Sequence, residues 1–338
     1  MQNIKRKTSR TVSTVRGSQP RKSGLLNEIR WHRGPPERYP YAHAVGERIG
    51  KDLTVIGHLA AGRSSELYQV WSTERWCPFT FKVLATKARE DRTARAALRR
   101  EGRILRRLDH PNLVRIFGDG EDEGLSFLLL EYLEGPSLFD VLETVPGRRM
   151  AVADAVRTVI HAGSAVVHMH RAGFLHLDLK PANLLLRGGV PVLLDLNTAR
   201  PVHPARAPRS SLGTTPYMSP EQVLRHPPGF PADVYGLGAI TYELLSGRWP
   251  FEDVYDGKDR RSGLERQYPQ IGDIPAPPLR RFRPEITRSL DRAVMKSLAR
   301  NPEDRFPTVT ELLIALSAEL KDSVSLWPKR AHPEPDST

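Results

Sequence analysis

Residues 174–197 read FLHLDLKPANLLLRGGVPVLLDLN, and this stretch decides the fold. Two apolar runs flank Arg-Gly-Gly at 187–189, which predicts a short antiparallel hairpin with a glycine turn. Asn183 enters the first predicted strand and Asp195 leaves the second, so we expect both side chains at the same end of the hairpin. Amide and carboxylate oxygens are the ligands of a hard cation such as Mg²⁺, which fills its other positions with water and phosphate.

A second carboxylate, that of Asp178, precedes the hairpin on a predicted loop, close enough to orient an incoming hydroxyl. Phosphoryl transfer needs positioning, a metal, positive charge and one acceptor for the proton of the attacking group. The stretch therefore indicates phosphoryl-transfer chemistry.

The composition is that of a globular protein without a membrane segment. The 338 residues are 39% hydrophobic and 27% charged, enough for one large two-lobed unit or two domains. The single cysteine, Cys77, excludes an intrachain disulfide or a cysteine-based zinc site. No stretch approaches the roughly 20 apolar residues of a membrane helix, and the basic N-terminus has no apolar signal-peptide core. We expect a cytoplasmic protein.

The two ends of the chain have a different composition from its body. Residues 1–48 hold eleven lysines and arginines against three glutamates, which is +8 of the +12 net charge. This charge suits an anionic surface or nucleic acid, but no aromatic-rich or groove-reading motif accompanies it, so we favour a flexible extension. The polar, proline-containing residues 321–338 predict a flexible tail.

Between these ends, a small β-rich part precedes a larger helical part. Short apolar runs within 53–84 and 125–135 predict antiparallel strands, and 93–108 repeats at helical spacing. We therefore predict an α+β fold with an N-lobe at about 49–133, a C-lobe at about 134–320 and a cleft between them. The helices expected in the C-lobe lie near 137–144, 152–172, 232–246, 286–299 and 308–320.

Two charged residues of the N-lobe are predicted to pair. Glu101 falls on the apolar face of the predicted helix 93–108, where an unpaired carboxylate is costly. Lys82 alternates with Phe81 and Val83 in the run FTFK and also needs a partner. Either residue taken alone is more commonly a surface charge, whereas together they predict an ion pair.

Several motifs in order make the chain resemble the eukaryotic-type protein kinases, in particular the bacterial Ser/Thr members. HLDLKPAN resembles the catalytic loop, LLDLN stands in place of the metal-binding Asp-Phe-Gly segment, and GTTPYMSPE (213–221) resembles the end of an activation segment. FTFK and RREGRILRRLDHPNLV carry the strand lysine and the helix glutamate. Further matches are ADVYGLGAITYELLSGRWPF (232–251) and NPEDRF (301–306). The resemblance covers about 50–320 and implies a two-lobed protein-kinase-like fold.

The resemblance also implies the roles of the polar residues. Asp178 would be the catalytic base and Lys180 would neutralise the transferred phosphate. Asn183 and Asp195 would bind Mg²⁺ or Mn²⁺, while Lys82, oriented by Glu101, would hold the α- and β-phosphates of ATP. The structural positions implied are Thr214 against Asp178 and Lys180, a buried pair of Glu221 with Arg305, and Asp233 bracing the catalytic loop.

The remaining nucleotide-binding positions implied by the resemblance include departures from the family pattern. Ala60 and Ser65 replace the outer glycines of the phosphate loop around Gly62, which should weaken the grip on nucleotide. Thr80 stands where alanine is usual above the adenine ring. The adenine contacts implied are the side chains of Leu59, Leu67 and Leu185 and the backbone of Glu131 and Leu133.

The implied function is an ATP-dependent serine/threonine protein kinase in signal transduction, acting on protein substrates. Lys180 and GTTPYMSPE favour serine and threonine as acceptors. One alternative is a pseudokinase serving as a nucleotide-binding or scaffolding module, suggested by LAAGRSSEL (59–67) and by the segment DLN. The other alternative is a small-molecule phosphotransferase of the same fold, against which GTTPYMSPE argues.

Leu177 stands where many family members have an arginine before the catalytic aspartate. That arginine pairs with a phosphate on the activation segment, and leucine cannot do so. We therefore expect that phosphorylation of the candidate positions, Ser210, Ser211, Thr214 and Thr215, does not switch activity through this site. Autophosphorylation is expected at Thr8, Ser9 and Ser13, which lie among basic residues of the extension.

Overall fold

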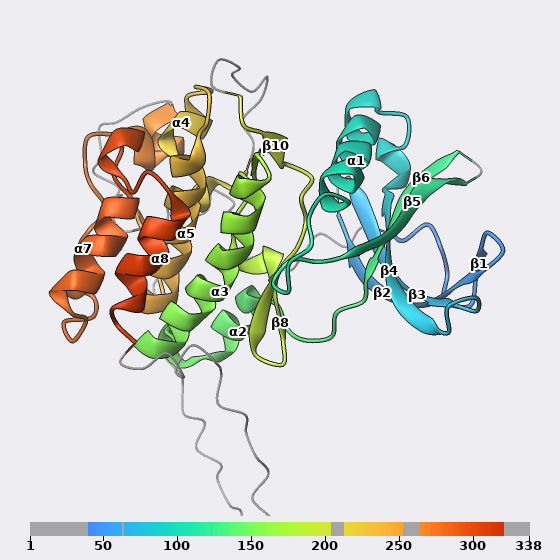
Figure 1. The fold of residues 1–338 in the computed structure, drawn as a ribbon, viewed down its shortest axis with the longest axis horizontal. Coiled ribbons are helices and arrows are strands. Elements are labelled where there is room, and N and C mark those ends of the chain that lie inside the picture. Colours follow the sequence, from blue (N-terminus) through green and yellow to red (C-terminus); the bar gives the residue numbers. More distant parts are fainter. Residues whose placement is uncertain (1–39, 63, 123, 204–212, 253–263, 321–338) are drawn as a thin grey trace, which may run out of the picture. The chain divides into compact units, whose positions relative to one another are not determined.

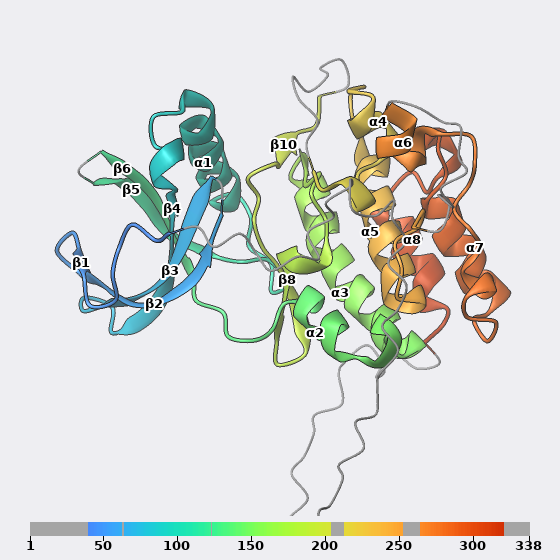
Figure 2. The ribbon, with the colours of Figure 1, turned by 180° about the vertical axis from the view of Figure 1, so that it is seen from behind.

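The computed structural model describes residues 40–320 apart from 63, 123, 204–212 and 253–263. Most of the predicted extension, the whole predicted tail, and Ser210 and Ser211 lie outside the described residues. Figures 1 and 2 show the described elements from opposite sides.

The N-terminal part is an antiparallel sheet in the order β1-β2-β3-β4-β6-β5 (Figure 1). Alternation of buried and half-buried side chains along β3 follows from the two-residue period of a strand and turns Tyr68 and Val70 toward the core. The strands are β1 (Arg48–Ile49), β2 (Leu53–Ala61), β3 (Ser65–Ser72), β4 (Cys77–Leu84), β5 (Ile116–Asp122) and β6 (Leu125–Glu131).

Helix α1 (Arg92–Leu105) packs on this sheet with its apolar stripe. It begins after Asp91, whose side chain accepts a hydrogen bond from the amide of Thr93 and caps the helix. Gly102 permits the close approach of α1 to β6, because a Cβ there would lie 2.9 Å from a methyl carbon of Leu128. The strand and helix predictions for this part are confirmed within a few residues at each end.

The C-terminal part is mainly helical and is organised around α5 (Phe230–Ser246). This helix is buried along almost its whole length and contacts α3, α7 and α8. It ends at Gly247, which is left-handed (φ +74°) and has no room for a Cβ against Gly147 O. The other helices are α2 (Leu138–Thr144), α3 (Val152–Arg171), α4 (Pro220–Val223), α6 (Leu264–Gln267), α7 (Arg288–Ser297) and α8 (Val309–Ser317).

Two small sheets lie within residues 174–201. β8 (Leu184–Arg187) pairs with β9 (Val190–Leu193) in the predicted antiparallel hairpin, which is therefore confirmed. β7 (Phe174–Leu175) pairs with β10 (Arg200–Pro201), so the chain on both sides of the hairpin is tied down. An antiparallel sheet followed by a mainly helical part confirms the predicted α+β, two-lobed fold.

Residues 40–48, which we placed in the flexible extension, contact the N-terminal sheet. The ring of Tyr41 stacks on His58 with centroids 4.0 Å apart, and the amides of Ala42 and His43 donate to the Tyr68 hydroxyl. These contacts fasten the chain immediately before β1.

Candidate active site

Lys82 on β4 contacts both Glu101 on α1 and Asp195, which follows β9. Its Nζ lies 2.8 Å from both carboxylate oxygens of Glu101 on α1 and 2.7 Å from Oδ1 of Asp195. The side chains of Lys82 and Glu101 are 5% and 1% exposed, whereas Asp195 is 32% exposed. The predicted contact of Lys82 with Glu101 is confirmed.

The charges of this triad depend on one another. Burial opposes the charged form of Lys82, but the carboxylates of Asp195 and Glu101 outweigh it and raise the lysine pKa above its ordinary value. Burial raises the pKa of Glu101, while for Asp195 the nearby lysine outweighs burial and lowers the pKa. Lys82 therefore stays protonated at neutral pH, and its removal would leave two carboxylates with no cation between them.

The loop after β7 holds Asp178 from several directions. Thr214 Oγ1 donates to Asp178 Oδ1 at 2.7 Å, and Lys180 Nζ donates to Asp178 Oδ2 at 2.8 Å and to Thr214 Oγ1 at 2.9 Å. Asn183 Nδ2 donates to the Asp178 backbone oxygen at 2.9 Å. The predicted contact of Thr214 with Asp178 and Lys180 is confirmed. Because both oxygens of the Asp178 carboxylate accept hydrogen bonds, these contacts orient the side chain.

Asp233 on the buried helix α5 supports this loop from below. Its Oδ1 accepts from the amide of Leu177, and its Oδ2 accepts from the amide of His176, both at 2.9 Å. His170 Nε2 lies 2.8 Å from the same Oδ2. Burial would raise the pKa of Asp233, but these partners, His170 foremost, outweigh it and lower the pKa. The predicted contact of Asp233 with this loop is present, and its bracing role stays a prediction.

Leu177 has an unusual backbone, with φ at +66°. A left-handed conformation is unfavourable for a branched side chain, so the hydrogen bond to Asp233 and burial of the side chain beside Leu175 and Ala232 must hold it there. The Leu177 carbonyl also accepts from Gln222 Nε2 at 2.8 Å. The loop that carries Asp178 is thus anchored at the preceding residue.

The two candidate metal ligands lie where the hairpin predicts them. Asn183 precedes β8 and Asp195 follows β9, and the backbone N–H of Leu194 donates to Asn183 O at 2.8 Å. Asp195 Oδ2 receives one long contact of 3.5 Å from Asn197 Nδ2. Within the described ranges, no group of three or more histidine, cysteine or acidic side chains could hold a metal. The oxygens of Asn183 and Asp195 fit a cation that takes most of its ligands from water and phosphate.

In the DLN segment the residue with a left-handed backbone is Asp195, with φ at +56°. Asn197, the third residue of the segment, does not have a positive φ. The ion pair with Lys82 holds the Asp195 side chain in place.

The predicted adenine positions lie on the strands that border the hairpin. Ala60 and Leu67 are cross-strand partners on β2 and β3, and Thr80 pairs with Leu130 across β4 and β6. Leu185 lies on β8, where it bridges to Ser137. Leu59 is exposed, Ala60 is exposed, and Gly62 and Leu67 are half-buried. The grouping of Leu185, Leu59 and Leu67 around adenine stays a prediction.

The structural pair of the C-terminal part is present. Arg305 Nη1 and Nη2 each lie 2.8 Å from one carboxylate oxygen of Glu221. The other guanidinium contacts are to backbone oxygens of Ala299, Pro231 and Arg300, and the Arg305 side chain is 0% exposed. The predicted pairing is confirmed.

Sequence reasoning missed the contacts of Arg100. Arg100 Nη2 donates to Asn197 O at 2.8 Å and Nε donates to Ala199 O at 3.2 Å. Arg200 donates to the same backbone, and burial together with Arg100 lowers the Arg200 pKa to about 10. Helix α1 is therefore bonded to the segment that follows Asp195. Nothing in the arginine-rich helix sequence distinguishes Arg100 from its neighbours.

Comparison with known proteins gives consistent results. The Protein kinase domain family model matches residues 53–315. The chain is 30% identical over 280 residues to a probable serine/threonine-protein kinase of Streptomyces coelicolor, covering 80% of this chain and 40% of that protein. It is also 30% identical over 262 residues to the serine/threonine-protein kinase PknB of Mycobacterium leprae, covering 75% and 40%. The chain thus spans less than half the length of these relatives.

A solved structure supports the fold. The Mycobacterium tuberculosis PknI kinase domain superposes with a TM-score of 0.63 at 23% identity, covering 82% of this chain and 100% of that one. Among the helices that the structure describes, none has the length and apolar character needed to cross a membrane.

Proposed function

The chain belongs to the protein kinase family, and from that premise we propose that it transfers the γ-phosphate of ATP to serine and threonine hydroxyls of protein substrates. The strongest support for this proposal is the ion-pair cluster around Lys82. Lys82, Glu101 and Asp195 come from three separate segments and meet within 2.8 Å. A buried lysine whose pKa is raised by two carboxylates is the kind of perturbed group that gathers at functional sites.

The nucleotide site follows from this triad. We propose that Lys82 contacts the α- and β-phosphates of ATP and that Glu101 fixes the direction of its side chain. Asn183 and Asp195 would hold Mg²⁺ or Mn²⁺, and the bound cation would neutralise phosphate charge. The adenine would lie among Leu59, Leu67, Thr80 and Leu185, with the backbone of Glu131 and Leu133 at its edge, and Ala60 and Gly62 would approach the phosphates.

The transfer itself is assigned to the loop that Asp233 supports. Asp178 would accept the proton of the attacking hydroxyl, because it is the carboxylate that Thr214 and Lys180 orient. Lys180 would place its positive charge beside the transferred phosphate. We also propose residues 49–320 as the kinase domain, with the lobes divided near 133. Autophosphorylation at Thr8, Ser9 and Ser13 stays a prediction.

Replacing Lys82 with methionine is expected to lower phosphate transfer about 100-fold or more, since one charged group that stabilises the reacting phosphates is lost. The measurement is transfer from radiolabelled ATP, with Mg²⁺ or Mn²⁺, to a general protein substrate and to the chain itself. The exposed Lys87→Met variant is the matched control. Phosphoserine or phosphothreonine made by the parent and lost in Lys82→Met supports the proposal. Nucleotide binding by the folded parent without any transfer would instead establish a pseudokinase.

Arg100→Met is expected to reduce kcat about tenfold, whereas treatment with a protein phosphatase should leave kcat unchanged. The reason is that Leu177 has no group to bind a loop phosphate, while Arg100 already donates charged hydrogen bonds to Asn197 and Ala199. Arg103→Met is the control, because Arg103 bonds only to its own helix at Arg99 O. A large loss of activity on dephosphorylation, restored by rephosphorylation, would contradict this prediction.

A further inference from the structure

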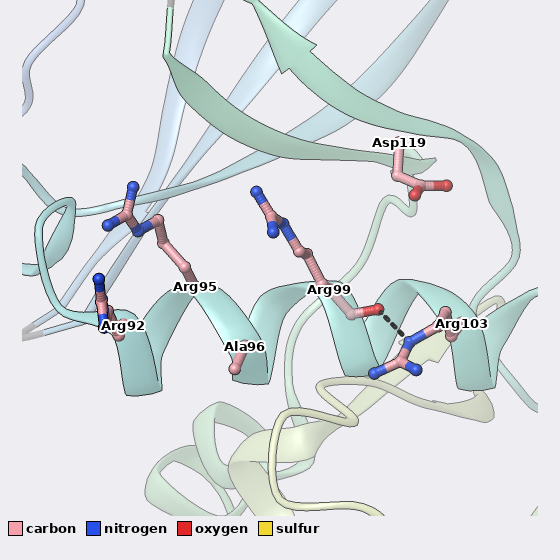
Figure 3. Close-up of a pocket in the computed structure, with 6 residues that line it drawn as sticks. All are labelled: Arg92, Arg95, Ala96, Arg99, Arg103 and Asp119. Carbon is pink, nitrogen blue, oxygen red and sulfur yellow. Dashed lines mark hydrogen bonds between the residues drawn. The ribbon is translucent and has the colours of Figure 1, made fainter.

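The outer face of helix α1 carries a stripe of four arginines. Arg92, Arg95, Arg99 and Arg103 follow one another at helical spacings of three, four and four residues, which places them on one side of the helix. Together with Ala96 and Asp119 they line an open pocket of about 730 Å³ (Figure 3). We call this set of four arginines the arginine stripe. None of these four arginines has a role in the proposed phosphate transfer.

Most of the positive charge of the stripe is not neutralised. Arg99 is paired with Glu121 at 2.8 Å, and both side chains are largely exposed. Arg103 donates to the backbone oxygen of Arg99 in its own helix and forms no ion pair with any residue that the structure describes. Among the residues that the structure describes, neither Arg92 nor Arg95 has a carboxylate within ion-pair distance. The only acid lining the pocket, Asp119, pairs with Arg106 beside it. The pocket therefore presents guanidinium groups to solvent without their counter-charges.

From this charge and shape we propose that the arginine stripe binds a phosphorylated segment of a protein partner. Guanidinium groups bind phosphate in a two-pronged manner, and three or four of them along one helix suit a single phosphoryl group with acidic neighbours. Arg92, Arg95 and Arg99 span two turns, about 10 Å, which is the length of a few extended residues.

The surroundings of the stripe argue against other polyanions. The neighbouring strand β5 carries Asp119, Glu121 and Asp122, so the positive charge is confined to the stripe, whereas a nucleic acid or an anionic membrane binds over a longer basic surface. No aromatic side chain lines the pocket for base stacking. The chain's own residues 1–48 are basic and have the wrong charge to occupy it.

Binding at the stripe reaches the proposed active site through the helix. Glu101 lies on the opposite, buried face of α1, where it holds Lys82 and accepts from the amide of Leu196. A segment that grips several turns of α1 would restrain the helix that positions Glu101. This coupling to activity rests on the proposed function, whereas the binding itself does not.

The test measures binding in the full-length Lys82→Met protein, so that catalysis is not needed. The probe is a fluorescent library of 12-residue peptides with a central phosphoserine flanked by glutamates, and the comparison library has serine instead. At near-physiological salt we expect the phosphorylated library to bind at least tenfold more tightly. The double variant Arg92→Gln/Arg95→Gln should lose at least tenfold of that affinity. Arg288→Gln/Arg292→Gln, which removes two exposed arginines of α7, should lose less than twofold.

Three results would overturn the inference. One is equal binding of the two libraries or no binding of either. Another is an equal loss in the α7 control, which would mean that only net charge matters. The third is that a DNA oligonucleotide or phosphatidylserine vesicles compete better than the phosphopeptides. In the catalytically intact protein, phosphate transfer without peptide binding would support the proposed function and contradict this inference. Peptide binding without phosphate transfer would support this inference and contradict the proposed function.

Discussion

Asp178→Asn is expected to slow phosphate transfer by about 10² to 10⁴-fold while the protein stays folded. Asparagine has the same shape as aspartate and can still accept the hydrogen bond from Thr214, which lies 2.7 Å from Oδ1. It has no carboxylate to take the proton of the attacking hydroxyl, and its amide group would face Lys180 Nζ, another donor. The loss should therefore appear in kcat, with the KM for ATP changed little.

The assay compares initial rates of transfer to a protein substrate for the parent and for Asp178→Asn. Asp273→Asn is a suitable control, since the Asp273 side chain is 97% exposed and pairs only with the surface residue Arg300. Unchanged thermal unfolding of both variants would show that the fold is intact. A rate within threefold of the parent would mean that another group accepts the proton.

Arg305→Met is expected to lower the free energy of unfolding by about 3–5 kcal/mol, the range for a buried ion pair that loses one partner. This guanidinium donates five hydrogen bonds, two to the Glu221 carboxylate and three to backbone oxygens. Methionine fills much of the space but leaves the buried carboxylate of Glu221 without a cation. For a domain of this size the melting temperature should fall by roughly 6–20 °C.

Equilibrium denaturation measures this loss, with Arg300→Met as the control because Arg300 is 47% exposed on its side chain. The double variant Glu221→Met/Arg305→Met should recover part of the stability, since no unpaired carboxylate then remains. A single-variant loss below about 1 kcal/mol would show that the pair is far weaker than its burial indicates.

The ion pair of the site could be predicted because the cost of burying each charge is offset by the other charge. Lys82 and Glu101 each interrupt an apolar pattern, so burial of either one demands the other, and the sequence alone was enough to pair them. The hairpin was predictable because its strands are adjacent in the chain and its glycines mark the turn. The family resemblance supplied Thr214, Asp233 and Arg305, whose partners lie dozens of residues away.

The contacts that could not be predicted join chemically ordinary residues over long separations. Seven arginines lie between 92 and 107, and only the folded chain shows that Arg100 reaches a backbone oxygen 97 residues away. Tyr41 lies in a stretch that charge alone marks as an extension, yet its ring stacks on His58. The left-handed backbone of Asp195 likewise accompanies a tertiary contact, the ion pair with Lys82, that joins residues far apart in the sequence.

Leu177 bears on how such a kinase would process information. A kinase that is activated by autophosphorylation of its activation segment has positive feedback. Active molecules activate further molecules, so a small stimulus can produce a lasting active state. If activity does not depend on loop phosphorylation, as we propose from Leu177 and from the contacts of Arg100, the kinase would have no such feedback. Its rate of phosphate transfer would rise in proportion to the concentrations of the kinase and of its substrate. Thresholds in the pathway would then have to come from the partners and not from this chain.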